Sequence, residues 1–252
     1  REGECTVAVV SESAVVGNNP GTPPFSILAS AGATDNASRV VTDRRKGITK
    51  AADLKGKRIG VRKGEISHLF VEMFLRKNGL KPEQVSIKLL EPQYLSEALL
   101  KGQIEAFAST DIYLTEATRR LGDNAVVLAE PGLCFNHSFL VIKKQELSER
   151  PQIADRLLRA LSKAESRAAR APEELVSIVS RRREIPQQDA KELVSRHRLR
   201  LTLQQQIFPG LADYHQFLQE QGITSGNKAA AYYSFIDSAP LKKFNPAAVN
   251  IN

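Results

Sequence analysis

One stretch, Gly56-Lys57-Arg58-Ile59-Gly60-Val61-Arg62-Lys63-Gly64-Glu65-Ile66-Ser67-His68, combines a strand, a tight turn and the start of a helix. Residues 58–61 fit a short buried strand, and apolar side chains recur at helical spacing over 65–78. A strand that turns directly into a helix aims the free N–H groups of the helix at the turn, where they can bind an anionic or carbonyl oxygen. Gly64 lets the backbone come close to such a group. We therefore expect this turn to form one wall of a ligand site.

The residues that follow repeat the alternation of strand and helix. Apolar runs at 85–90 and 104–108 fit strands, and the patterns at 94–101 and 112–121 fit helices. Strands that alternate with helices predict a parallel sheet with helices on its faces. The fold class that we expect is therefore α/β.

Further elements are predicted on either side of this segment. The run 5–10 is continuously apolar and fits a strand covered on both faces, with polar residues but no clear helix behind it. The other predicted strands are 25–30, 39–42, 126–129 and 137–142. The predicted helices of the last third are 151–170, 172–183, 187–197, 204–221 and 227–237, and a loose tail follows them.

The composition is that of an ordinary globular protein, with 42% hydrophobic and 25% charged residues among 252. A run of about 18 apolar residues, which a membrane-spanning helix needs, does not occur in the sequence. The net charge is +8, but acids are interspersed with the basic residues, and the basic run 181–183 is short and lacks interleaved aromatic residues. We therefore expect a solvated charged face and no nucleic-acid partner.

The two cysteines, Cys5 and Cys134, are too few for a disulfide scaffold, and neither belongs to a CxxC pair. Cys5 opens an apolar strand, so we expect a buried thiol there. A single disulfide in an oxidising compartment stays open as an alternative.

Two segments, 3–12 and 102–111, resemble each other. Each has a glycine, a polar residue, an apolar strand, and then a hydroxyl and a carboxylate. Two βα units precede the second copy, whereas two residues precede the first. We therefore expect that the first βαβα of one half of the architecture is missing from this chain. The alternative, in which strand 5–10 simply begins a fold, stays open.

Several pieces of the chain carry a resemblance to a known family. They are Lys46-Gly47-Ile48, Asp53-Leu54-Lys55-Gly56-Lys57-Arg58-Ile59-Gly60-Val61, the turn from Lys63-Gly64 to His68, and Leu99-Leu100-Lys101-Gly102-Gln103-Ile104-Glu105-Ala106. Through these pieces the chain resembles the substrate-binding proteins of nitrate-, sulfonate- and taurine-type ABC importers. That group has the type II periplasmic binding fold and includes thiamine-precursor binders.

The resemblance implies two βα lobes joined by a hinge of two crossover strands, a helical C-terminal third, and a ligand held between the lobes. Lobe I would comprise 1–43 and 124–252 and would be incomplete at its N-terminus, and lobe II would comprise 44–123. The resemblance further implies a periplasmic or otherwise extracytoplasmic protein, with a signal peptide outside this chain, that works with an ABC-transporter membrane permease. We expect a monomer without cofactor or metal.

In an open parallel sheet, ligands bind beyond the carboxyl ends of the strands. Polar residues follow the apolar strands at these ends, and we take them as candidate ligand-binding residues. The candidates in lobe II are Lys63, Gly64, Glu65, Ser67, His68, Glu91, Thr110, Asp111 and Tyr113, and those in lobe I are Ser11, Glu12, Ser13, Asn136 and His137.

Structural roles compete with ligand binding for several candidates. Ser67 and Asp111 could cap helices, and Glu65 could be a favourable acid in a first helical turn. His68 could be a packing residue, and Tyr113 a surface aromatic on its helix. These alternatives stay open.

The charges of the candidates bear on the ligand. Four of them are acids, and Lys63 and His68 oppose them. A purely anionic ligand would not require so many carboxylates. We therefore expect a ligand with at least one amine or heteroaromatic nitrogen, which includes zwitterions.

The sequence lacks the common catalytic motifs. No two of the four histidines have HxxxH or HExxH spacing, and no nucleophile elbow, P-loop or dinucleotide fingerprint occurs. Cys134 and His137 lie three residues apart, which is a weak signal for an activated nucleophile. We therefore do not expect an enzyme.

The function that we expect is that of an extracytoplasmic solute-binding protein for a small organic molecule or oxyanion, such as a sulfonate, nitrate, a taurine-like compound or a nitrogen heterocycle. Two alternatives stay open: a ligand-sensing module of a signalling protein, and a thiamine-precursor biosynthesis protein on the same fold. The former would need a transmembrane segment, and the latter a histidine-rich site with an iron-binding cluster. Neither feature is visible in the sequence.

Overall fold

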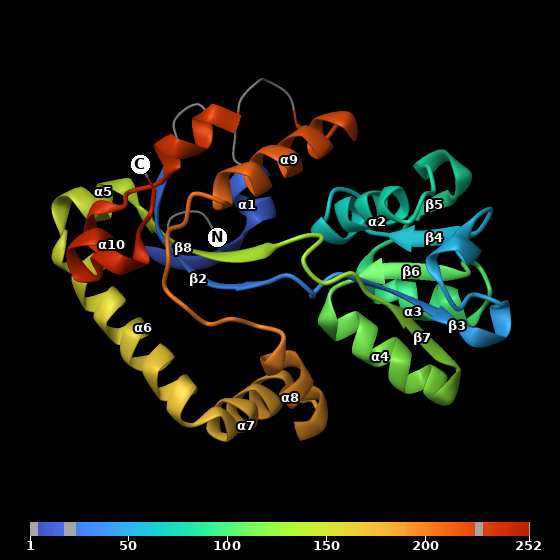
Figure 1. Cartoon of the computed structure of the whole chain (residues 1–252). Helices are drawn as coiled ribbons and strands as arrows, with labels where there is room; N and C mark the ends of the chain where they lie inside the picture. Colours follow the sequence, from blue (N-terminus) through green and yellow to red (C-terminus); the bar gives the residue numbers. More distant parts are fainter. Residues whose placement is uncertain (1–4, 18–23, 225–228, 252) are drawn as a thin grey trace. The chain divides into compact units, whose positions relative to one another are not determined.

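The computed structural model describes residues 5–17, 24–224 and 229–251, with the backbone alone at 111, 112 and 229–231. The chain divides into two compact units, whose elements are labelled in Figure 1. Unit 1 comprises 1–34 and 136–252, and unit 2 comprises 35–135. Each unit has a sheet of its own.

Unit 2 contains a five-stranded sheet in the order β5-β4-β6-β3-β7 (Figure 1). Its strands are β3 (Arg39–Asp43), β4 (Arg58–Val61), β5 (Ser86–Leu89), β6 (Ala106–Ser109) and β7 (Ala125–Leu128), and its α-helices are α2 (Ile66–Lys77), α3 (Pro92–Leu100) and α4 (Asp111–Leu121). β4 is parallel to both β5 and β6, which confirms the predicted parallel core. β3 is antiparallel to β6 and β7, and these two added pairings make the unit wider than the predicted lobe II at 44–123.

The two faces of this sheet pack against different helices, because successive side chains of a strand point to opposite faces. Val40 and Ile59 belong to a core that includes Phe70 of α2. Val41 and Phe107 belong to a second core, which is completed by residues of α3 and α4. Helices therefore cover both faces, and the β4–α2 turn is anchored at both its ends.

Unit 1 contains a three-stranded antiparallel sheet in the order β1-β8-β2. Its strands are β1 (Val7–Ser11), β2 (Phe25–Thr34) and β8 (Asn136–Lys143). The expectation that the first strand is covered on both faces is wrong. None of the β1 side chains is buried, and Val9 is 58% exposed, because β1 is an edge strand of a small sheet within the described residues.

Most of unit 1 after β8 is helical. Its α-helices are α1 (Glu12–Gly17), α5 (Lys144–Glu149), α6 (Gln152–Arg170), α7 (Pro172–Arg183), α8 (Gln187–Ser195), α9 (Ile207–Glu220) and α10 (Ala239–Phe244). The sequence pattern did not predict α1, α5 or α10, since six residues are too few to show a helical period. In place of the predicted helix 227–237, residues Ala229–Phe235 form a 3₁₀ helix, η5, and 227 and 228 lie outside the described residues. The other 3₁₀ helices are η1 (Arg44–Lys46), η2 (Ala51–Leu54), η3 (Pro82–Gln84), η4 (Gly122–Asn124) and η6 (Pro246–Ala248).

Both cysteines are free of disulfide bonds. The Cys5 thiol is exposed and donates to the carbonyl oxygen of Val7 at 2.6 Å. The predicted buried thiol at this position is wrong, because Cys5 precedes the exposed edge strand. Among the described helices, none combines the length and the apolar character that a membrane crossing requires.

Candidate functional site

Three helices of unit 2 begin at one edge of its sheet. α2 follows β4, α3 follows β5 and α4 follows β6, and these three strands are neighbours that run parallel. Because the carboxyl ends of parallel strands meet at the same edge, the candidate residues of this unit are gathered there. We call them the unit 2 set: Lys63, Gly64, Glu65, Ser67, His68, Glu91, Thr110, Asp111 and Tyr113.

Arg62, which sequence reasoning did not single out, links two acids of the unit 2 set. Its Nη1 lies 2.6 Å from Oε1 of Glu65, and its Nε lies 3.3 Å from Oε2 of Glu91. The hydrogen bond to Glu65 is the main reason that the pKa of Arg62 lies above its usual value. These two carboxylates are therefore paired with a cation, and they leave less negative charge at the edge than a count of acids suggests.

Gly64 and His68 contact each other at the start of α2. Gly64 has a φ of +72°, which glycine adopts without strain, and its N–H donates to Nδ1 of His68 over 3.4 Å. Burial, reinforced by the charge of Lys63, lowers the pKa of His68 to about 4, so the imidazole is neutral at pH 7. Ser67 and His68 are both buried. A role of this turn in donating N–H groups to a ligand stays a prediction.

The start of α4 holds three further candidates. Thr110 precedes the helix, and its hydroxyl makes no capping hydrogen bond to it. Asp111 is the first residue of α4, but its side chain lies outside the described part, so its choice between capping and ligand contact stays a prediction. Tyr113 is half-buried and lies close enough to Arg62 to contribute to the raised pKa of that residue.

In unit 1 the antiparallel pairing of β1 with β8 gathers the candidates. Ser11 at the end of β1 pairs with Ser138, which places the start of β8 beside the start of α1. The Oγ atoms of Ser11 and Ser13 lie 2.7 Å apart, and both side chains are exposed. We call these residues the unit 1 set: Ser11, Glu12, Ser13, Asn136 and His137, together with Ser30. The parallel arrangement that we expected for this strand end is wrong, since its partner β8 runs the opposite way.

Glu12 is only 3% exposed although it carries a carboxyl group. It is the first residue of α1, so the expectation that no helix follows this strand is wrong. Its carboxyl accepts a hydrogen bond from the backbone N–H of His137, which connects the start of α1 to β8. Burial raises the pKa of Glu12 to about 8, against a smaller lowering effect of that hydrogen bond. Glu12 is therefore mostly protonated at pH 7.

His137 is held by Ser30, a residue of β2 that sequence reasoning did not select. Nδ1 of His137 lies 3.2 Å from Oγ of Ser30, and the Ser30 hydroxyl donates to the carbonyl oxygen of Gly32 at 3.1 Å. Since one hydroxyl hydrogen serves one acceptor, this arrangement favours donation from Nδ1–H to Ser30. Burial lowers the pKa of His137 to about 4, so its ring is neutral at pH 7, and the ring stacks on Phe139. Asn136 pairs with Thr34 of β2 and lies next to this ring in the strand.

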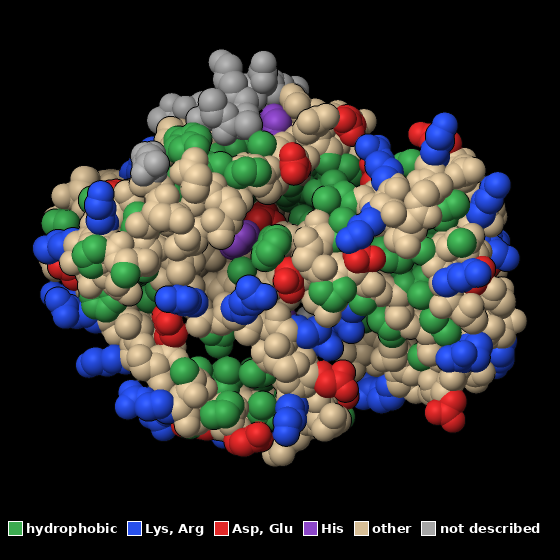
Figure 2. Space-filling view, in the orientation of Figure 1, with side chains coloured by type: hydrophobic (Ala, Val, Ile, Leu, Met, Phe, Trp, Pro, Cys, Tyr) green, Lys and Arg blue, Asp and Glu red, His purple; other side chains and the backbone are tan. Residues whose placement is uncertain are grey.

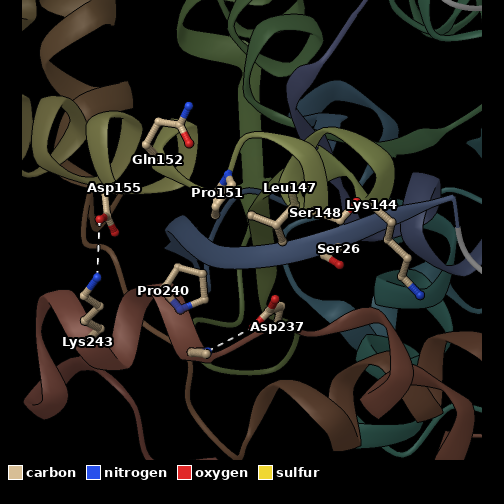
Figure 3. Close-up of a pocket in the computed structure, with 11 residues that line it drawn as sticks. Ser26, Lys144, Leu147, Ser148, Pro151, Gln152, Asp155, Asp237, Pro240 and Lys243 are labelled. Atoms are coloured by element: carbon tan, nitrogen blue, oxygen red, sulfur yellow. Dashed lines mark hydrogen bonds and ion pairs between the residues drawn. The ribbon is translucent and has the colours of Figure 1, made fainter.

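Unit 1 also has a cavity of about 690 Å³ that lies outside the candidate residues (Figure 3). β2, the corner between α5 and α6, and the start of α10 line it. Figure 3 shows Lys243 directed at Asp155, with 3.7 Å between Nζ and Oδ2. Asp237 accepts a hydrogen bond from the N–H of Ala239. Asp155, Lys243 and Asp237 at this cavity thus already have partners within the protein.

Charged side chains of both signs are mixed over the face of the molecule shown in Figure 2, and no single basic patch stands out on it. Such mixing is typical of a solvated surface. Within the described residues, no group of three or more His, Cys, Asp and Glu side chains could hold a metal ion.

Comparison with known proteins gives a family match and several relatives. The profile of the family described as "NMT1/THI5 like" matches residues 2–175. A candidate binding protein of Brucella abortus (strain 2308) is 27% identical over 142 residues, which are 54% of this chain and 44% of that protein. A candidate aliphatic sulfonates-binding protein of Bacillus subtilis (strain 168) is 25% identical over 128 residues, which are 51% of this chain and 39% of that protein. The chain thus spans less than half the length of these curated relatives.

Among solved structures, the periplasmic aliphatic sulphonate binding protein SsuA of Escherichia coli resembles this chain with a TM-score of 0.76 and 15% identity. The likeness covers 93% of this chain and 80% of that one. At this identity it shows the fold alone, which is that of periplasmic binding proteins. The predicted α/β periplasmic-binding fold is thereby confirmed.

Proposed function

Because the chain belongs to the NMT1/THI5-like family, we propose that it is a solute-binding protein that delivers a small organic molecule or oxyanion to an ABC importer. The main support for this proposal is the edge of the unit 2 sheet. Three helices of this chain begin there, at the carboxyl ends of parallel strands. The first N–H groups of a helix have no partner within the helix, so an edge at which helices begin suits an anionic or carbonyl oxygen.

Sulfonates are the ligand class to test first. The Bacillus relative and the Escherichia neighbour both carry sulfonate binding in their names. The described side chains are compatible with an anion, because Arg62 pairs with Glu65 and Glu91 and because Glu12 is mostly protonated at pH 7. Our expectation of an amine or heteroaromatic nitrogen in the ligand rested on counting four acids as charged, these three and Asp111. The structure removes most of that reason.

The remaining features of the proposal concern the setting of the protein. We propose that it acts outside the cytoplasm, as a monomer, with the membrane permease of an ABC transporter as its partner. We also propose that it binds its ligand without converting it, as the names of the curated relatives suggest. The fold alone does not decide this point, since solved neighbours of the same fold include an enzyme.

A thermal-shift screen tests the proposal. The melting temperature of the full chain is measured with ethanesulfonate, taurine, nitrate and an aminopyrimidine, and the incubated compounds are then checked for chemical change. We expect at least one of them to raise the melting temperature in a saturable way, because a ligand that binds only the folded state stabilises it. We expect every compound to be recovered unchanged.

Two variants make the screen specific to the candidate site. Lys63→Ala should weaken the shift given by an anionic compound, because it removes the cation of the unit 2 set. Lys191→Ala removes another exposed cation, from α8 in unit 1, and should leave the shift as it was. If none of the compounds changes the melting temperature, the proposed function is wrong.

A further inference from the structure

The connection between β3 and β4 concentrates positive charge on unit 2. Residues 43–58 contain seven basic and two acidic side chains, a net +5 within a chain of net +8. Ile48, Ala51 and Leu54 of this segment are buried in the core beneath it, which fixes the connection to the body of the unit. The basic side chains are Arg44, Arg45, Lys46, Lys50, Lys55, Lys57 and Arg58.

The sheet holds this connection at the edge opposite to the unit 2 set. β3 ends and β4 begins on either side of the start of β6, because β6 is antiparallel to β3 and parallel to β4 (Figure 1). Glu105, just before β6, holds both: its carbonyl oxygen accepts from the Thr42 hydroxyl at 2.7 Å, and its carboxylate accepts from the N–H of Arg58 at 2.8 Å. Lys46 lies over the turn before β6, since a Cβ added at Gly102 would be 3.6 Å from its Nζ. The connection is therefore anchored at both its ends.

The two acids of the connection are held by groups within it. Oδ2 of Asp43 lies 2.6 Å from Nη2 of Arg45. Oδ2 of Asp53 accepts hydrogen bonds from the N–H groups of Thr49 at 2.9 Å and Lys50 at 3.1 Å. We call the cations of the connection that form no ion pair within the described residues the basic end: Arg44, Lys46, Lys50, Lys55 and Lys57. All five side chains are exposed or half-buried.

The composition of the basic end favours a diffuse anionic surface over a protein or a nucleic acid as its partner. Four of its five cations are lysines, and residues 43–58 contain no aromatic side chain. Protein interfaces are depleted in lysine and anchored by aromatic residues, and proteins that bind single-stranded nucleic acid stack the bases on aromatic side chains. A bilayer with anionic headgroups requires only cations within a Debye length of its surface.

We propose that the basic end docks unit 2 on a membrane surface that contains anionic lipid headgroups. This inference goes beyond the proposed function, because the candidate ligand residues of unit 2 lie at the opposite edge of the same sheet. Docking and ligand binding can therefore be tested separately. Docking of this kind would keep a protein that works with a membrane permease close to that permease.

Sedimentation of the full chain with lipid vesicles tests the inference. One kind of vesicle is phosphatidylcholine alone, and the other contains about one-third phosphatidylglycerol, whose headgroup is anionic. We expect the chain to sediment with the anionic vesicles at low salt and to be released at about 1 M salt, where the Debye length is about 3 Å. The neutral vesicles should leave it in solution. Equal binding to both kinds, or no binding to the anionic kind, overturns this inference and leaves the proposed function standing.

Two double variants assign the binding to the basic end. Lys50→Gln/Lys55→Gln removes two of its exposed cations and should lower the affinity for anionic vesicles about 25-fold, because each cation near such a surface contributes about fivefold. Lys163→Gln/Lys191→Gln removes the same charge from exposed positions on α6 and α8 and should bind as the unmodified chain does. An equal loss in both variants would reflect net charge alone and overturns the proposal. Both should keep any melting shift that a sulfonate gives, since neither changes the unit 2 set.

Two competitors distinguish a lipid surface from other sources of negative charge. Glycerol phosphate at the phosphate concentration of the vesicles should not displace the chain, because a single headgroup lacks the charge density of a bilayer surface. Displacement by it would indicate a site for one phosphate group and overturns the proposal. A duplex DNA that binds the chain at the same salt more tightly than the anionic vesicles do overturns it as well.

Discussion

A Cβ atom added at Gly60 in β4 would lie 2.8 Å from Cδ1 of Ile104 and 2.8 Å from Cδ2 of Leu95. Neither distance is sterically acceptable, so the strand or its neighbours would have to move. Glycine is needed here because the sheet and α3 approach closely, and its backbone conformation is an ordinary one. The residue lies in the strand that leads into the β4–α2 turn, so its packing supports the candidate site.

We predict that Gly60→Ala lowers the free energy of unfolding by about 1–3 kcal/mol, the usual cost of overpacking a core. Urea denaturation measures the change. Gly210→Ala in α9 is the matched control, because nothing lies within 4 Å of its added Cβ, and alanine favours a helix over glycine. Equal midpoints for Gly60→Ala and the unmodified chain would show that the packing described here is wrong.

A second prediction at this scale concerns Glu105 and Arg58. The backbone N–H of Arg58 donates to Oε2 of Glu105 at 2.8 Å, and its guanidinium also contacts the carboxylate. These contacts lower the pKa of Glu105 to about 2, mainly through the side-chain hydrogen bond. A depressed folded-state pKa gives stability that is present above the ordinary value of 4.5 and is lost as the pH falls towards 2. The unmodified chain should therefore lose stability over this range more steeply than Glu105→Gln, and parallel melting curves against pH would contradict this.

Sequence reasoning located polar residues at strand ends but could not assign their charge. Glu12 looks like any acid that follows a strand, and its protonation depends on burial by elements far away in the chain. Arg62 stands beside Lys63 in the quoted stretch, yet its pairing with Glu65 and Glu91 requires the β4 and β5 ends to be adjacent. Tertiary contacts thus changed the charge that we expect of the ligand. They changed the choice of candidate ligand-binding residues less.

At the scale of elements, a long or strongly apolar pattern was sufficient for prediction. β4 at 58–61 and α7 at 172–183 have the predicted bounds. The six-residue helix α1 was missed, because fewer than two helical turns show no period. The exposure of β1 was also missed, since its place at a sheet edge depends on pairing with β8, more than a hundred residues away.

One element-scale prediction concerns the attachment of η5 to α9. Nδ1 of His215 lies 2.6 Å from the hydroxyl oxygen of Tyr232, and both residues are buried. Burial raises the pKa of Tyr232 to about 12, so the hydroxyl stays protonated. Tyr232→Phe leaves a buried imidazole nitrogen without this partner and should cost about 1–3 kcal/mol of unfolding free energy.

The neighbouring tyrosine supplies the control for this change. The Tyr233 hydroxyl is bonded to Gln205 at the surface, and the side chain is 44% exposed. Tyr233→Phe should therefore change stability little, because water can replace the lost contact. Equal effects of the two substitutions in urea denaturation would argue against a specific anchor at His215.

At the scale of the whole molecule, the chain consists of two units with separate sheets. The resemblance to periplasmic binding proteins predicted this two-part architecture, and the predicted lobe boundaries at 43/44 and 123/124 stay a prediction. Unit 2 extends further, over 35–135, because β3 and β7 join its sheet by antiparallel pairing. Such pairing between distant strands leaves no local signal in the sequence.

The central claim is that this chain binds a small organic molecule or oxyanion, with sulfonates as the first class to test. Calorimetric titration of the full chain with ethanesulfonate at pH 7 tests it most directly. We predict saturable binding that is weaker in Lys63→Ala, because this change removes the cation of the unit 2 set. Lys191→Ala should bind as the unmodified chain does. No saturable heat with ethanesulfonate, taurine or nitrate would contradict the account.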